Sequence, residues 1–278
     1  MPDIQQHLAV SQKVDFDDLD WAAARAAGLS PREQKNLEFF ADVESQTFFY
    51  FLEVAKLEIS RDPDLISFLT MWNYEEHFHA QALSKLMAEC GCPVPPAGSR
   101  AAKLRAAARL RARLEDAFQV SLARAMPQTF VALWMTWGAS QELLTCQGYE
   151  SLVNGTRNPV LAELARRIGK QERRHFAYYF ASARERLEGD RVAQRVVRTI
   201  LERNWNPAGS GVKSPAEQAE FITNLFPDPV ATFSHTDERL GTLPGLAGVS
   251  PAMNWLRRVA PQLITSAPGP AHSMAAAS

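Results

Sequence analysis

The sequence predicts an all-α protein, a four-helix bundle with a long crossover between its second and third core helices and with extra C-terminal helices. Two observations support this prediction. Four segments carry inward-facing residues at alternating three- and four-residue steps, which is the stripe of a bundle helix. A Glu-x-x-His pair also occurs twice, as Glu76 with His79 and as Glu172 with His175. Residues three apart share one helix face, so each pair can reach a single metal ion.

The composition fits one large domain without a strong charge. The chain has 278 residues, of which 46% are hydrophobic, and a formal net charge of -1. That balance gives no overall attraction to nucleic acid or to an anionic membrane. No apolar run approaches the ~18 residues of a membrane span, and the N-terminus does not resemble a signal peptide. We therefore expect a soluble, cytoplasmic protein. The three cysteines make neither a disulfide framework nor a metal ligand set.

Helix signals and proline content divide the chain into four parts. Residues 1–29 form an N-terminal arm with a short helical piece around residues 19–27, and residues 30–205 form the bundle. Residues 206–264 are a C-terminal cover of loops and short helices, which we expect near residues 215–225 and 250–259. Residues 265–278 are expected to be a disordered tail.

The first core helix begins after Ser30, a candidate N-cap that is followed by a proline at the first helical position. It is expected to run unbroken through a stripe of Leu37, Phe40, Glu44, Thr47 and Phe51. Glu44 interrupts the apolar part of the stripe and is a candidate metal ligand. The other acids of this segment lie off the stripe and are interpreted as solvated charges: Glu38, Asp42, Glu53 and Glu58.

The second core helix follows Asp62 and Pro63 and carries the first ligand pair in the middle of its stripe, which is Leu65, Leu69, Trp72, Glu76, His79, Leu83 and Leu86. Glu75 lies about 100° around the helix from Glu76, so it is expected to support the site from behind or to face solvent. Clustered proline and glycine end the helix after Cys92. The crossover to residue 125 contains an arginine-rich helix, which is either a solvated face or a docking surface for an acidic partner.

The third and fourth core helices supply the remaining ligands. The third begins near Pro127, and its stripe is Val131, Met135, Gly138, Glu142, Thr145, Tyr149 and Leu152. Gly138, one turn before Glu142, either leaves room beside the metal for oxygen or substrate or allows close helix packing. The fourth begins at Asn158 and Pro159 and presents Leu161, Ala165, Ile168, Glu172, His175, Tyr179 and Ser182. A fifth helix is expected at residues 191–205.

Four inward glutamates, Glu44, Glu76, Glu142 and Glu172, would place carboxylates where an unpaired one costs several kcal/mol. The stripes hold no lysine or arginine to pair with them, only the two histidines. Two divalent cations would balance the charge. Carboxylate and imidazole ligands suit iron or manganese, and the lack of thiolates argues against a structural zinc site. We expect two iron ions, with manganese as an alternative ion in one site.

Four local sequences carry a family likeness: WNYEEHFH at residues 72–79, QELLT at 141–145, NPVLA at 158–162, and ERRH at 172–175 followed by Tyr178. They resemble the soluble acyl-acyl-carrier-protein desaturases of the ferritin-like di-iron superfamily, over about residues 35–205. By this resemblance Thr145 is a candidate for handling protons during oxygen activation. The alternative is a hydroxyl bonded to its own helix backbone. The resemblance implies the iron ligands Glu44, Glu76, His79, Glu142, Glu172 and His175.

Two departures from the family pattern fall beside the ligands. Phe78 stands where the family usually has arginine before the first histidine, and Gln171 stands where it usually has aspartate before the glutamate of the second pair. Such positions orient metal-bound histidines, so Gln171 is expected to support the site from behind the ligands. Two related activities are disfavoured. Leu83 replaces the radical tyrosine of ribonucleotide reductase small subunits, and Ile168 replaces the seventh ligand of arylamine oxygenases.

The resemblance implies an O2-dependent oxidoreductase that removes hydrogen from an unactivated C–H bond and so desaturates an acyl chain on acyl carrier protein. The alternatives are a di-iron oxygenase of specialised metabolism and an iron-storage or ferroxidase protein. The sequence has no flavin or nicotinamide motif, so electrons would come from a donor such as ferredoxin, and the family likeness implies a homodimer. Residues that would line an acyl channel, or form ordinary core, are Phe40, Phe48, Phe51, Trp72, Met135 and Gly138.

Overall fold

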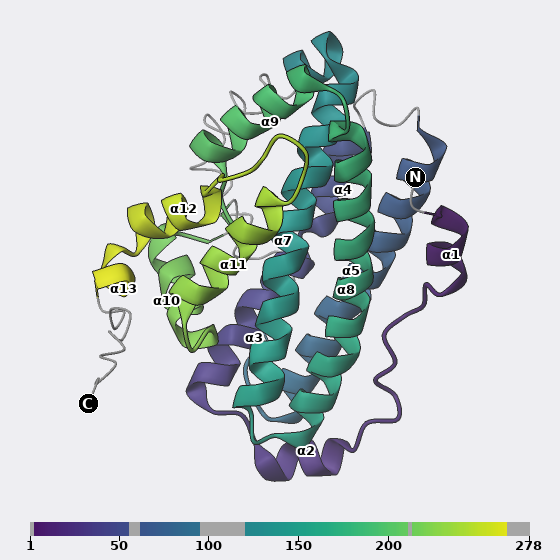
Figure 1. The fold of residues 1–278 in the computed structure, drawn as a ribbon. Coiled ribbons are helices and arrows are strands. Elements are labelled where there is room, and N and C mark those ends of the chain that lie inside the picture. The colour runs from purple at the N-terminus through teal and green to yellow at the C-terminus, as the bar shows by residue number, and fades with distance from the viewer. Residues whose placement is uncertain (1–2, 56–61, 95–119, 211–212, 266–278) are drawn as a thin grey trace, which may run out of the picture.

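The computed structural model describes residues 3–55, 62–94, 120–210 and 213–265. Within these residues the chain is helical and has no strand, which confirms the all-α prediction. The long core helices run side by side (Figure 1): α3 (Pro31–Glu44), α5 (Pro63–Glu89), α7 (Pro127–Gly155) and α8 (Pro159–Leu187). None of the described helices is long and apolar enough to cross a membrane. The arginine-rich part of the crossover and all but the first residue of the predicted tail lie outside the described residues.

Side-chain caps set the starts of three core helices. Ser30 accepts the backbone N–H of Glu33, and the Glu33 carboxylate accepts the Ser30 N–H in return. Asp62 and Asn158 each accept two backbone N–H groups in the first turn of α5 and α8. A proline follows each of these caps, at the first helical position, where the backbone N–H would have no partner within the helix. The cap and the proline together define the residue at which each helix begins.

The first core helix differs from its prediction because it breaks just after Glu44. α3 ends there, and α4 (Thr47–Ala55) continues after a two-residue turn. Around that turn the Ser45 hydroxyl donates to the Asp42 carbonyl at 2.9 Å, and the Thr47 hydroxyl donates to the Glu44 carbonyl at 2.8 Å. Such bonds compete with the hydrogen bonds of a helix. Phe48, which we expected to line an acyl channel, follows the break, and half of its surface is exposed.

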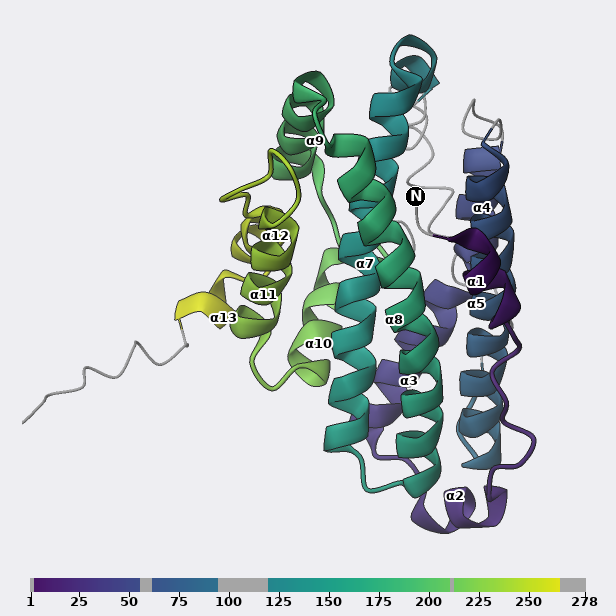
Figure 2. The ribbon, with the colours of Figure 1, turned by 45° about the vertical axis from the view of Figure 1, so that its right-hand side comes forward.

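The remaining helices cover two sides of the bundle. α1 (Ile4–Ala9) packs on α5, and α2 (Trp21–Ala27) packs on α5 and α8. On the α7 side (Figure 2) lie α9 (Arg191–Asn204), α10 (Pro215–Leu225), α11 (Pro229–Gly241), α12 (Pro251–Val259) and α13 (Pro261–Thr265). Our predictions missed α1, α11 and α13. The buried face of α11 consists of Phe233, Thr236, Asp237 and Leu240. Because two of these residues are polar, the sequence shows no apolar stripe that would predict this helix.

The structure decides between the two interpretations of Gly138. A Cβ atom built at this position would overlap the ring of Tyr179, which is itself buried. The space beside Gly138 is therefore filled by α8, and it does not remain open for oxygen or substrate. The missing side chain serves the close packing of α7 on α8, which make the most extensive helix contact of the described fold.

We expect Gly138→Ala to destabilise the fold by about 1–3 kcal/mol, because the added methyl must displace the Tyr179 ring. The better helix propensity of alanine offsets this by less than about 1 kcal/mol. Gly155→Ala is the matched control, since it lies on the same helix and a Cβ there has no neighbour within 4 Å. Urea unfolding of the two variants measures the difference. Equal free energies of unfolding would contradict the packing role of Gly138.

Candidate metal centre

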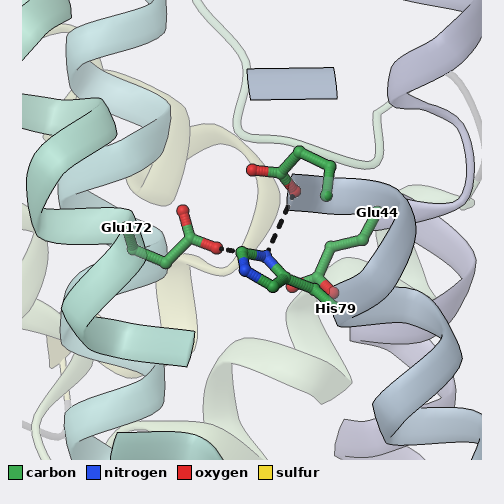
Figure 3. Close-up of side chains that lie close together, drawn as sticks. Glu44, His79 and Glu172 are labelled. Atoms are coloured by element: carbon green, nitrogen blue, oxygen red, sulfur yellow. Dashed lines mark ion pairs between the residues drawn. The ribbon is translucent and has the colours of Figure 1, made fainter. Parts of the chain in front are cut away.

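Four core helices bring all six predicted ligands together. Glu44 comes from the end of α3 and Glu142 from α7, while α5 and α8 each supply one Glu-x-x-His pair. The residues form two groups, each of which can hold a metal ion: Glu44, Glu76, His79 and Glu172 in one, and Glu76, Glu142, Glu172 and His175 in the other. Within each group the ligand atoms lie within 4.8 Å of one another. Figure 3 shows part of the first group converging from three helices.

Both histidines point the same ring nitrogen at the carboxylates. His79 Nδ1 lies 3.1 Å from Glu172 Oε1 and 3.8 Å from Glu76 Oε2. His175 Nδ1 lies 3.2 Å from oxygens of both Glu76 and Glu172, and 3.8 Å from Glu142. Glu76 and Glu172 thus face both rings. One glutamate from each of two helices and a Glu-x-x-His pair from each of the other two form the ligand set that would hold a pair of metal ions in a helical bundle.

Three atoms of the first group are buried without a hydrogen-bond partner: Glu44 Oε2, His79 Nδ1 and Glu172 Oε1. His79 Nδ1 and Glu172 Oε1 are close together, but they are not aligned as a hydrogen bond. Buried polar atoms are rarely left unsatisfied, and each such atom needs an explanation. All three are good donors to a divalent cation, so a metal ion at this position would satisfy all three at once. The donor set therefore fits a metal.

Burial controls the protonation of these groups in the metal-free protein. Burial raises the pKa of Glu44 and of Glu142 well above the usual range, and neighbouring carboxylates raise it further. Burial alone would lower the pKa of His79 and of His175, but the buried glutamates beside the two rings raise it well above normal. Without metal, protons therefore offset part of the negative charge. Metal ions would replace these protons, so binding must release protons and weaken as the pH falls.

Each histidine is held from behind by a second side chain. His79 Nε2 lies 2.6 Å from Gln171 Oε1, and His175 Nε2 lies 2.7 Å from Glu75 Oε2. The other Glu75 oxygen accepts a hydrogen bond from Arg174 at 2.8 Å. Glu75 is fully buried, so of its two predicted placements the supporting one holds and the solvent-facing one does not. Partners of this kind fix the ring orientation of metal-binding histidines.

Two aromatic residues hold two of the carboxylates, a role that the sequence reasoning missed. Trp72 Nε1 donates to Glu142 at 2.9 Å, and the Tyr149 hydroxyl donates to Glu44. The Tyr149 ring stacks on Phe40 with a centroid distance of 4.6 Å, which keeps its hydroxyl in place. Both residues stand on the inward stripes. Because aromatic residues at such positions are ordinary core, only their polar atoms signalled the second role.

The predicted catalytic and pocket residues have mixed surroundings. Thr145 is half-buried and stands one turn after Glu142 on α7. Met135 is fully buried, and Phe51 is half-buried against the core. Phe40 and Trp72 are also buried. Phe40 stacks on Tyr149, and Trp72 donates to Glu142. Phe48 is half exposed and therefore does not line a buried channel.

The comparisons with known proteins found no relative. The chain matches no family model, no curated protein and no solved structure. Function must therefore be inferred from the residues of the site.

Glu172→Ala should lower the metal content from two ions per chain toward none, because Glu172 belongs to both ligand groups. Glu150→Ala is the matched control, since Glu150 is an exposed glutamate on the bundle helix α7. Elemental analysis after anaerobic loading with ferrous iron measures both variants. Two ions retained in the Glu172 variant would show that the ligand assignment is wrong.

Proposed function

We propose that the protein is a di-iron oxidoreductase that uses O2 to remove hydrogen from an unactivated C–H bond, with an acyl chain on acyl carrier protein as its substrate. The observation that carries the proposal is the pair of buried ligand groups, which share Glu76 and Glu172 and contain one histidine each. Glu76 and Glu172 would contribute to holding both ions, with one histidine for each. When bound, iron supplies the reductive activation of O2 and the oxidising power for the C–H bond.

The hydrogen bonds behind the histidines support a ligand role for both rings. Gln171 donates through its Nε2 to the Gln12 carbonyl, so its oxygen is left to accept the His79 Nε2–H. The Glu75 carboxylate accepts the His175 Nε2–H. Both Nε2 atoms therefore carry a proton, and each Nδ1 can give its lone pair to an ion.

Burial of the site suits an oxidant that must not react with solvent. The six ligands expose between 0% and 6% of their surfaces. A site closed in this way keeps water from the reacting atoms and strengthens the electrostatic interactions inside it. The electrons would come from a separate donor such as ferredoxin, because the sequence has no motif for a flavin or a nicotinamide.

A di-iron oxygenase is the second candidate function. The observation that supports it is the identity of Gln171, the residue behind His79. The desaturases that the sequence resembles usually have a carboxylate at this position, whereas Gln171 is a neutral amide. A neutral partner makes the imidazole a weaker donor and so changes the tuning of the ion. An iron-storage or ferroxidase protein could use the same ligands, and assembly into a cage would support that third candidate.

The proposed reaction is tested by loading the protein with iron and supplying a reductant, O2 and long-chain acyl groups on acyl carrier protein. We expect mass spectrometry to show the loss of two hydrogens from the acyl chain. The Glu172→Ala protein under the same conditions is the control and should leave the chain unchanged. Gain of an oxygen atom would favour the oxygenase instead. An unchanged chain on a protein that holds two irons would exclude this substrate class.

A further inference from the structure

We propose that the N-terminal arm is part of the metal centre, and that the backbone of Gln12 positions both ligand histidines at once. The inference rests on the proposed metal site and adds a positioning residue to it. The Gln12 N–H donates to Glu75 Oε1 at 3.1 Å, and the Gln12 carbonyl accepts from Gln171 Nε2 at 2.9 Å. Glu75 and Gln171 are the two side chains that hold His175 and His79.

One residue of the arm thereby closes a hydrogen-bonded bridge between two bundle helices. The bridge runs from His175 on α8 through Glu75 on α5 to Gln12, and then through Gln171 on α8 to His79 on α5. Each helix contributes one histidine and the partner of the other helix's histidine. Gln12 joins the two partners, so a shift of the arm would be transmitted to both rings.

The amide at position 171 is what makes this bridge possible. An amide has both a donor and an acceptor, and Gln171 uses its donor on the arm and its acceptor on His79. A carboxylate at this position could accept from His79 but could not donate to the Gln12 carbonyl. The departure from the aspartate of the desaturases therefore matches the presence of a carbonyl from the arm.

The arm is anchored on both sides of Gln12, so its position is defined. Before it, Ile4 is buried and the His7 ring packs edge-on against Tyr178 with a centroid distance of 5.2 Å. After it, Val14 is buried, and the guanidinium of Arg167 on α8 donates to the Asp15 carbonyl at 2.8 Å. Figure 2 shows α1 lying beside α5, the helix that carries Glu75. The Gln12 side chain itself is exposed, and the residue acts through its backbone.

This difference between backbone and side chain gives a matched pair of variants. Gln12→Pro removes the N–H that Glu75 accepts, whereas Gln12→Ala keeps the N–H and removes only an exposed side chain. Losing a direct partner of a metal-bound histidine costs about 10- to 100-fold in metal affinity. Gln12 is one hydrogen bond further from the ion than these direct partners. We therefore expect Gln12→Pro to lose roughly three- to tenfold in metal affinity.

Cobalt(II) is the probe, since its visible absorption reports both its affinity and its coordination geometry. We expect wild type and Gln12→Ala to give the same titration and spectrum, and Gln12→Pro to bind cobalt more weakly with shifted bands. Gln171→Glu tests the other half of the bridge, because its carboxylate still accepts from His79 but repels the Gln12 carbonyl. In that variant we expect amide hydrogen exchange to become faster across residues 11–14.

The outcomes separate the two proposals. An unchanged cobalt titration and spectrum in Gln12→Pro would overturn the role of the arm while the metal site stands, and so would unchanged exchange in Gln171→Glu. If the wild-type protein bound neither cobalt nor iron, the proposed metal centre itself would be wrong.

Discussion

Burial of four carboxylates at one level of a helical bundle is the constraint on which the rest of this structure depends. In the described part of the chain their charged partners are the two histidines, which cannot neutralise four anions. The metal-free protein meets the cost by holding protons, as the raised pKa values of Glu44, Glu142 and both histidines indicate. The fold is thus poised to exchange those protons for cations.

The aromatic residues around the site combine packing with ligand support. Tyr149 is fully buried and Trp72 nearly so, and each gives its single polar hydrogen to a carboxylate of the site. Because such side chains are locked by their neighbours, the carboxylates are held in place before any ion arrives. The same packing explains Gly138, where the space beside the helix belongs to the Tyr179 ring.

The sequence predicted the core helices and the six candidate ligands because both follow from local periodicity. A helix places residues three and four apart on one face, and Glu44, Glu142 and the two Glu-x-x-His pairs are the polar residues that interrupt apolar faces. The break after Glu44 was not predictable in this way. At the break the hydroxyl groups of Ser45 and Thr47 donate to backbone carbonyls, and periodicity carries no information about such bonds. Gln12 left no signal at all, because its contacts are made by backbone atoms with residues 63 and 159 positions away.

The two histidines differ in what stands behind them, and this difference makes the two ligand groups inequivalent. His175 donates to the Glu75 carboxylate, which Arg174 and the Gln12 N–H also contact, whereas His79 donates to a neutral amide. A carboxylate partner makes an imidazole more electron-donating than an amide does. The ion bound with His175 would therefore have the stronger nitrogen ligand. The amide of Gln171 makes His79 the weaker ligand, but unlike a carboxylate it can donate to the Gln12 carbonyl. This hydrogen bond connects the N-terminal arm to the metal centre.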